Sequence, residues 1–271
     1  MKEELKNFIA DMGSLPSLPS LYLQLTEELR SPEVSANRVS RIISKDLAMT
    51  SKILQIVNSA YFGLSRQISS VERAILLMGL EMLRTFVLSA EVFSMFEPKK
   101  LAGLTVAGLW RHSMSCSSMA RRVALAESLS KEATEHVCTA AFLHDIGKLL
   151  MANEKPDSYR RVSEIVNDGQ LPCYEAEENV FGFTHAEAGG VLLTRWNLPE
   201  PVVDTVLWHH DPIGCTQSSI SAVAIVHVTN FLEHEQNDEP QGQTTEISPA
   251  YLEQIGAGEA MERWREAAAE M

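Results

Sequence analysis

The sequence predicts an all-α protein organised in two lobes. Apolar residues recur at helical spacing along almost the whole chain, and no segment shows the alternation typical of a half-buried strand. Seven of the eight histidines lie between His112 and His227, which indicates that a functional lobe begins near residue 100. The predicted lobes are therefore residues 1–98 and residues 99–271.

Helix-start and helix-stop residues divide the first lobe. Asp46 is expected to cap one helix. Ser69 and Glu72 form an S-x-x-E pattern, which predicts a capping box for a helix that stops at Gly79. The other expected boundaries are a helix that ends at Ser31 and Pro32, and a helix over 81–95 that Pro98 terminates.

In the second lobe, a helix is expected from residue 110 to residue 126. Ser130 should cap the next helix, which runs to His144. Thr184 and Glu187 form a second capping box, which places His185 in the first turn of a helix. The polar stretch 233–248 is expected to be a loop, and 258–271 an amphipathic helix.

The net charge of −13 gives no electrostatic reason to expect binding to nucleic acid or to an anionic membrane. No apolar stretch is long enough to span a bilayer, and the acidic N-terminus is unlike a signal peptide. A cytoplasmic protein is therefore expected. The four cysteines form no CxxC pair and are expected to be small core residues: Cys116, Cys138, Cys173 and Cys215.

The histidine-rich region suggests a metal site, because imidazole and carboxylate groups are ligands for zinc, iron, nickel and manganese. A single histidine is more often a surface or hydrogen-bonded residue, so the joint occurrence carries the prediction. One or two ions are expected, and Lys148 could balance phosphate charge or hold a carboxylate. The candidate ligands are His112, His144, Asp145, His185, His209 and His210.

Four other residues of this lobe are not expected to bind a metal. His136, His227 and His234 are expected to be structural or solvated, and Asp211, which precedes a proline, to begin a turn. The segment NSAYFG in the first lobe is expected to close a turn. Asn58 and Ser59 are expected to bond local backbone, and Tyr61 and Phe62 to pack in the core between the lobes. A ligand pocket formed by these four residues between the lobes is the less favoured alternative.

Several long motifs resemble the HDOD domain of bacterial signalling proteins. In the first lobe they are LPSLP, KDLAMTSKILQIVNSAYFG and ISSVERAILLMG; in the second, LWRHS, FLHDIGKLL, FGFTHAEAGGVLLTRWNLPEPVVDTVLWHHDP and IVHVTNFL. The resemblance covers roughly 15–232. It implies a two-lobed helical fold whose C-terminal lobe is similar to HD-type phosphohydrolases.

The resemblance also bears on the site. The pattern of HD phosphohydrolases, including the HD-GYP cyclic di-GMP phosphodiesterases, matches the six candidate ligands and Lys148. Two features depart from it. The final aspartate of the pattern falls at Asn230, and the tripeptide GYP is absent from the sequence. The resemblance therefore implies a partly retained metal site.

Three functions follow from these observations. The favoured one is a regulatory module that acts by binding other signalling proteins. The alternative is a metal-dependent phosphohydrolase acting on a nucleotide or cyclic dinucleotide, with Asp145 and Lys148 in the reaction; such a phosphate-containing molecule could also be a ligand only. The third is a structural domain that a bound metal stabilises and that has no sensing role. Asn230 and the missing tripeptide weigh against catalysis.

Overall fold

The computed structural model describes residues 1–58, 66–96, 101, 103–215, 219–237 and 247–269. These residues form helices joined by short connections, and none of them lies in a β-strand. The predicted all-α class is confirmed. Across the same residues, no helix combines the length and the apolar character that a membrane crossing requires.

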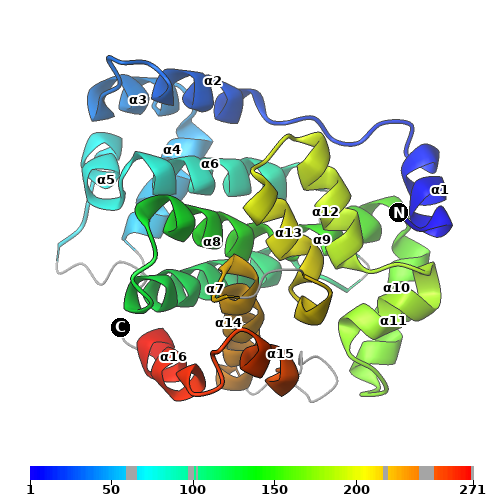
Figure 1. Cartoon of the computed structure of the whole chain (residues 1–271). Helices are drawn as coiled ribbons and strands as arrows, with labels where there is room; N and C mark the ends of the chain where they lie inside the picture. Colours follow the sequence, from blue (N-terminus) through cyan, green and yellow to red (C-terminus); the bar gives the residue numbers. More distant parts are fainter. Residues whose placement is uncertain (59–65, 97–100, 102, 216–218, 238–246, 270–271) are drawn as a thin grey trace. The chain divides into compact units, whose positions relative to one another are not determined.

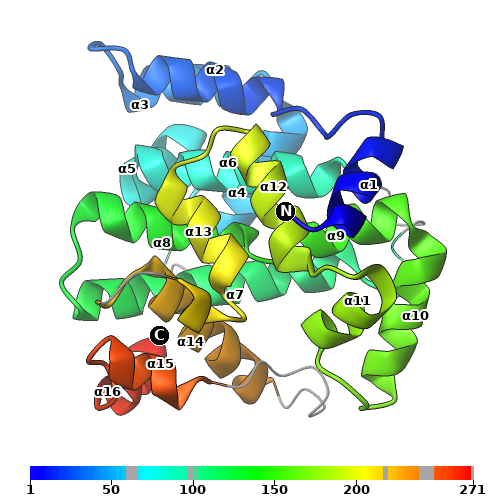
Figure 2. The ribbon, with the colours of Figure 1, turned by 45° about the vertical axis from the view of Figure 1, so that its right-hand side comes forward.

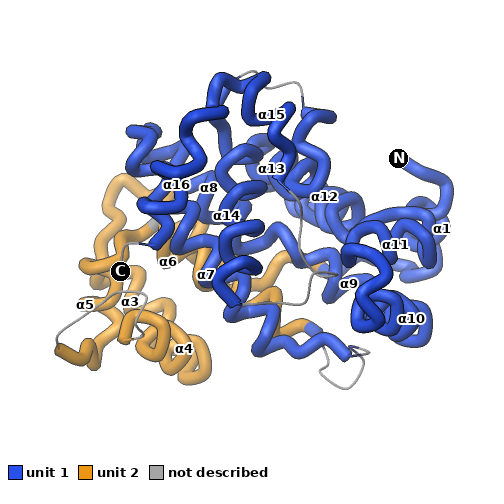
Figure 3. The backbone as a smooth tube through the Cα atoms, turned by 90° about the horizontal axis from the view of Figure 1, so that it is seen from below, with its two compact units in different colours: residues 1–16, 96–270 blue, residues 17–95, 271 orange. Residues whose placement is uncertain are grey.

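The chain divides into two compact units, which Figure 3 colours separately. One comprises Ser17–Met95 and the other combines Met1–Pro16 with Phe96–Glu270. The first sixteen residues thus group with the histidine-rich unit, whereas the sequence placed them in the first lobe. Helix α1 (Glu3–Asp11) explains the difference, because Phe8 packs edge-to-face against Phe181 and at a tilt against Phe183, with ring centroids 6.4 and 5.2 Å apart.

The described residues of the unit Ser17–Met95 contain five helices, each of which buries an apolar face. Its helices are α2 (Ser20–Leu29), α3 (Ala36–Ile43), α4 (Leu47–Val57), α5 (Val71–Met78) and α6 (Leu80–Ser94). Asp46 caps α4 as predicted, since its carboxylate accepts the N–H of Met49. The predicted capping box at Ser69 is wrong by one residue. Ser70 caps α5 instead, by accepting the N–H of Arg73.

Asn58 follows α4 and bonds local backbone, as expected from its turn chemistry. Its amide donates to the carbonyl oxygens of Leu54 and Ile68, each at 2.7 Å, and its side-chain oxygen accepts the N–H of Ile68. Ser59, Tyr61 and Phe62 lie outside the described residues.

The histidine-rich unit is built around α7, which packs against α8, α14 and α16, while α12 packs against α9 and α13 (Figures 1 and 2). Beyond α1, its helices are α7 (Val106–Ala126), α8 (Lys131–Leu143), α9 (Ile146–Glu154), α10 (Pro156–Asn167), α11 (Cys173–Phe181), α12 (His185–Arg195), α13 (Glu200–Trp208), the 3₁₀ turn η3 (Pro212–Gly214), α14 (Ala222–Gln236), α15 (Pro249–Gln254) and α16 (Ala260–Ala269).

The two helix caps predicted in this unit are confirmed. Ser130 caps α8, and Thr184 and Glu187 form a reciprocal capping box at the start of α12. Asp211 precedes the turn η3, as expected. The prediction of a loop over 233–248 is wrong in its first part, because α14 continues to Gln236. Glu233 is buried against His112 there, and this contact holds the last turn of the helix in place.

Candidate metal centre

A break between two helices presents His144 and Asp145. Helix α8 ends at Leu143 and α9 begins at Ile146, so these two residues lie between the helices rather than within either one. Asp145 precedes α9 but its carboxylate makes no capping hydrogen bond. Both side chains are buried. The carboxylate is therefore available for side chains from other helices.

Glycine lets α9 approach α12 closely at this point. A Cβ atom on Gly147 would lie 2.0 Å from the carbonyl oxygen of His185 and 2.9 Å from the backbone nitrogen of Gly189. Such distances exclude any side chain at this position unless the backbone moves. The close approach brings Asp145, two residues before Gly147, against His185 at the start of α12.

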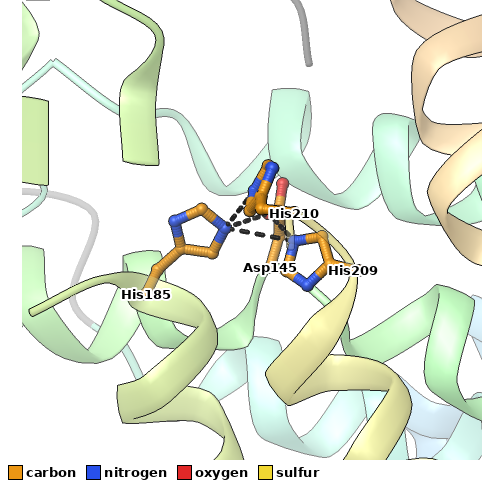
Figure 4. A group of neighbouring side chains, drawn as sticks. All are labelled: Asp145, His185, His209 and His210. Carbon is orange, nitrogen blue, oxygen red and sulfur yellow. Dashed lines mark hydrogen bonds and ion pairs between the residues drawn. The ribbon is translucent and has the colours of Figure 1, made fainter. Parts of the chain in front are cut away.

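His185, His209 and His210 form the three-histidine cluster, which surrounds one oxygen of Asp145 (Figure 4). Nε2 of His185 lies 3.1 Å from Asp145 Oδ1, 3.3 Å from Nε2 of His209 and 3.0 Å from Nε2 of His210. His209 and His210 follow the last residue of α13. Three imidazoles and a carboxylate therefore direct their donor atoms at a common point.

Buried acceptors fix the orientation of these rings. Glu177 on α11 is fully buried, and its Oε2 accepts from Nδ1 of His185 at 2.6 Å and from the backbone N–H of the same residue at 2.7 Å. The hydroxyl of Tyr159 donates to the other oxygen of Glu177 at 3.0 Å. Nδ1 of His209 donates to the carbonyl of Val206 at 2.7 Å. The Nε2 atoms of His185 and His209 are thereby turned toward Asp145.

His112 and His144 form the two-histidine cluster, which faces the other oxygen of Asp145. Their Nε2 atoms are 3.1 Å apart, and each lies 3.5 Å from Asp145 Oδ2. Nδ1 of His144 donates to the carbonyl of Ala141 at 2.7 Å, and Nδ1 of His112 donates to Glu233 Oε2 at 2.6 Å. The two oxygens of Asp145 thus serve two separate groups of histidines.

Burial and charge act in opposite directions on these groups. Burial alone would raise the pKa of Asp145, but His144 and Lys148 lower that pKa well below its usual range. Lys148 donates to Asp145 Oδ2 at 2.8 Å. Burial lowers the pKa of His144 to about 3 and that of His209 well below its usual value. The carboxylate is ionised and the imidazoles of His144 and His209 are neutral, which are the forms that bind metal.

Burial also opposes protonation of His112 and His185, but nearby groups outweigh it. Cys116 and Glu233 raise the pKa of His112 well above its usual value, and Glu177 and Asp145 raise the pKa of His185. These two rings therefore have to release a proton when they bind a metal.

The donor arrangement fits a cation. A neutral imidazole has one N–H, so a ring that donates through Nδ1 keeps a lone pair on Nε2. Lone pairs on His112 and His144 would then face each other at 3.1 Å, and the lone pair on His185 would face Asp145 Oδ1. That oxygen is buried and has no hydrogen-bond partner among the described residues. A metal ion in each cluster would satisfy all of these atoms.

A cavity of about 590 Å³ adjoins the centre, a size common for small-molecule sites. His112, Asp145 and Lys148 line it, together with Arg111 from α7. Its other polar lining residues are the acid Glu233, His234, Tyr159, Cys173 and the hydroxyl and amide groups of Thr105, Ser115, Ser163, Asn167 and Asn237.

All six ligands predicted from the sequence therefore lie at one centre. Lys148 holds the carboxylate of Asp145, one of the two roles expected for it. His227 is structural, since its Nδ1 donates to the carbonyl of His209 at 2.8 Å. His234 is also buried and stacks on His112 with ring centroids 4.8 Å apart.

Three residues that contact the candidate ligands were not foreseen. Glu177 and Glu233 occur in acid-rich stretches that resemble any solvated helix, so nothing in the sequence marks them as partners of histidine. Cys116 was expected to be only a core residue. Its Sγ lies 3.6 Å from Nε2 of His112, and its spacing of four residues from that histidine was a usable signal.

The fold agrees with comparisons to known proteins. The family model of the HDOD domain matches residues 15–212. A crystal structure of an HDOD domain protein from Geobacter sulfurreducens has a TM-score of 0.77 at 24% identity, and the match covers 97% of this chain and 87% of that one. At this identity the likeness shows the fold.

Two curated relatives also match. An uncharacterized protein of Treponema pallidum is 27% identical over 238 residues, which are 84% of this chain and 44% of that protein. The Vibrio cholerae cyclic di-GMP phosphodiesterase CdgJ is 36% identical over 86 residues, which are 31% of this chain and 20% of that protein. The chain therefore spans less than half the length of these curated relatives.

Proposed function

This chain belongs to the HDOD domain family, and from that premise we propose that it is a bacterial signalling module controlled by a two-metal centre. The centre would bind two divalent transition-metal ions, drawn from iron, manganese, nickel and zinc, and a phosphate-containing small molecule in the adjoining cavity. The form of the module that holds the metal ions and the ligand would transmit the signal by binding other signalling proteins.

One observation carries the metal proposal: the two oxygens of Asp145 face different histidine clusters. Oδ1 lies 3.1 Å from Nε2 of His185, and Oδ2 lies 3.5 Å from Nε2 of both His112 and His144. A carboxylate whose two oxygens face two separate groups of imidazoles could serve as a ligand for two ions. A single structural ion would use only one of these groups.

The phosphate proposal rests on charge at the cavity wall. Lys148 is 12% exposed at its side chain and lies against Asp145, while Arg111 lines the same cavity. Two bound ions would add positive charge next to them, so an anionic ligand would be favoured. The likeness to a cyclic di-GMP phosphodiesterase over 86 residues makes cyclic di-GMP the first probe to test.

Metal content measured by plasma mass spectrometry tests the centre. Wild-type protein loaded with manganese or zinc should hold two ions per chain. His144→Ala should lose the ion of the two-histidine cluster, and His209→Ala the ion of the three-histidine cluster. His136→Ala, a partly exposed histidine outside both clusters, is the matched control and should hold two. Folded wild-type protein that takes up no metal would overturn the proposal.

Calorimetry with cyclic di-GMP and with guanosine monophosphate tests the cavity. Binding should require the metal-loaded protein and should weaken in Lys148→Met, because the ammonium group no longer offsets phosphate charge. A loaded protein that binds neither nucleotide, nor inorganic phosphate, would exclude a phosphate ligand. If that protein still holds its metal ions, the proposed metal centre would stand although the phosphate ligand is excluded.

Phosphoester hydrolysis is the second candidate function, and the side-by-side placement of two clusters favours it. Two divalent ions would supply Lewis acidity for phosphoryl transfer. Asp145 would position both, and Lys148 would offset negative charge on the phosphoryl oxygens. Asn230 stands where the HD pattern has aspartate, so Asn230→Asp should raise any turnover of the same nucleotides. If neither the metal-loaded wild type nor metal-loaded Asn230→Asp releases product, hydrolysis is excluded and ligand binding remains the proposed role of the cavity.

A further inference from the structure

Glu233, near the end of α14, uses its two carboxylate oxygens for two different partners. Oε2 accepts from Nδ1 of His112 at 2.6 Å, and Oε1 accepts from Nδ2 of Asn237 at 2.7 Å. Glu233 is only 5% exposed, whereas Asn237 is exposed and lines the cavity beside the metal centre. An interior carboxylate therefore links a residue of the cavity wall to a candidate metal ligand.

The surroundings of Asn237 decide which end of its amide faces Glu233. Nδ2 lies 2.7 Å from Oε1 of Glu233 and 2.9 Å from the backbone oxygen of the same residue. Carboxylate and carbonyl oxygens accept hydrogen bonds, so the amide has to present its N–H groups to them. Its Oδ1 then remains as an acceptor, and no residue in the part of the chain that the structure describes donates to it. A molecule in the cavity that carries an N–H or O–H group has a partner there.

The three-histidine cluster has a similar link, but that link is enclosed. The hydroxyl of Tyr159 donates to Oε1 of Glu177 at 3.0 Å, and Oε2 of Glu177 accepts from Nδ1 of His185 at 2.6 Å. Tyr159 borders the same cavity but is 1% exposed. Of the two links, the one through Asn237 is therefore the one that a bound molecule can reach.

We propose that Asn237 is a positioning residue that couples the ligand of the cavity to the ion held by His112 and His144. A ligand that donates to Oδ1 would fix the amide, and the amide would fix the carboxylate of Glu233. The carboxylate would then hold the ring of His112 with Nε2 toward the ion. A nucleotide supplies such a donor from its base or its ribose. This inference rests on the proposed metal centre and phosphate ligand, and adds how the ligand regulates one half of that centre.

The coupling should be positive. The exposed side chain of Asn237 loses conformational entropy when it holds Glu233, and a ligand that has already ordered the amide removes this loss from ion binding. A hydrogen bond to Oδ1 also makes the N–H groups of the amide better donors. Because coupling between two sites is reciprocal, the ion should tighten ligand binding by the same factor. One hydrogen bond places that factor near the lower end of the usual range, at about 5-fold.

Capping of α14 explains the position of Asn237 only in part. Its bond to the backbone oxygen of Glu233 satisfies an acceptor in the last turn of the helix. The end of the helix does not require the second bond, which goes to the carboxylate. A residue with a capping role alone would affect the free energy of unfolding and leave metal affinity unchanged, so metal affinity separates the two roles.

Zinc titration of the full chain tests the positioning role. Asn237→Ala should bind zinc about 5-fold more weakly at one of its two sites. The same loss should appear in the His209→Ala background, which keeps the ion of the two-histidine cluster, and not in the His144→Ala background, which keeps the other ion. Asn153→Ala is the matched control and should bind zinc as the wild type does. Nδ2 of Asn153 also donates to a carboxylate, that of Glu154 at 2.8 Å, but outside the cavity and both clusters.

The same titration with saturating guanosine monophosphate or inorganic phosphate tests the coupling. Phosphate contacts the ions directly and should tighten zinc binding equally in wild type and Asn237→Ala. The nucleotide should tighten it by about a further 5-fold in the wild type, and this excess over phosphate should vanish in Asn237→Ala. Tyr159→Phe, which breaks the enclosed link, should bind zinc more weakly at the other site and keep the excess.

The outcomes separate this inference from the proposed function. Equal zinc affinities of Asn237→Ala and wild type would overturn the positioning role and leave the metal centre standing. A nucleotide that does not bind, or that binds and adds nothing to the effect of phosphate, would overturn the coupling. Wild type that takes up no zinc would overturn the metal centre and this inference together. If Asn237→Ala does not fold, as judged by circular dichroism, the comparison of nucleotide with phosphate in the wild type decides the question.

Discussion

The close approach of α9 and α12 should fail when Gly147 gains a single methyl group. In Gly147→Ala the new Cβ would meet the carbonyl oxygen of His185 at 2.0 Å. Both atoms that collide with it, this oxygen and the nitrogen of Gly189, belong to backbone. No side-chain rotation can relieve the contact, so one helix has to move by more than 1 Å, roughly the shortfall from van der Waals contact.

The expected cost follows from packing. Overfilling a close-packed interior costs about 1–3 kcal/mol, and the better helix propensity of alanine returns up to about 1 kcal/mol. Because backbone has to shift, we expect a net loss of about 2 kcal/mol, which lowers Tm by about 4–8 °C in a unit of this size. The same movement separates Asp145 Oδ1 from Nε2 of His185, now 3.1 Å apart, and metal distances tolerate only about 0.2 Å.

Thermal unfolding of the chelator-treated protein and metal content of the loaded protein measure the two effects. Gly190→Ala is the matched control on α12, because its Cβ would meet only side-chain and backbone atoms of Leu207 at 3.4 Å or more. That variant should be unchanged or stabilised by about 0.5–1 kcal/mol and should keep both ions. Equal Tm and equal metal content in the two variants would refute the role assigned to Gly147.

Two further predictions concern residues behind the ligands. Glu177→Gln should weaken metal binding in the three-histidine cluster by about 10–100-fold, because the charge that orients His185 is lost. Glu178→Gln is the control at an exposed neighbour paired with Lys2 and should not weaken it. Equal metal affinities of the two variants in a metal titration would contradict this prediction. Burial lowers the pKa of His227, so below about pH 6.5 the unfolded chain takes up this proton and the folded chain does not. Unfolding free energy should therefore fall with pH below 6.5, and less steeply in His227→Gln by urea titration; parallel profiles would count against it.

The sequence by itself determined the helical class and most helix starts. Caps act within four residues, so Asp46, Ser130 and Thr184 could be recognised locally. The same locality explains the error at Ser69, because two adjacent serines offer equivalent caps and only the path of the chain into α5 selects Ser70. The six candidate ligands could also be named, since the spacing of HD and HH doublets is a property of the chain.

Only the tertiary structure decided how those ligands are divided. Asp145 faces His185 on one side and His112 on the other, although 40 and 33 residues separate it from them. Glu233 is 121 residues from His112, whereas Glu177 is only 8 residues from His185 but lies on a separate helix. Each carboxylate looks solvated until its helix packs. Contacts of this kind depend on which helix faces meet, and local propensity holds no information about them. The candidate histidines could therefore be named from the sequence, whereas the carboxylates that orient them became apparent only in the packing of α7, α11, α12 and α14.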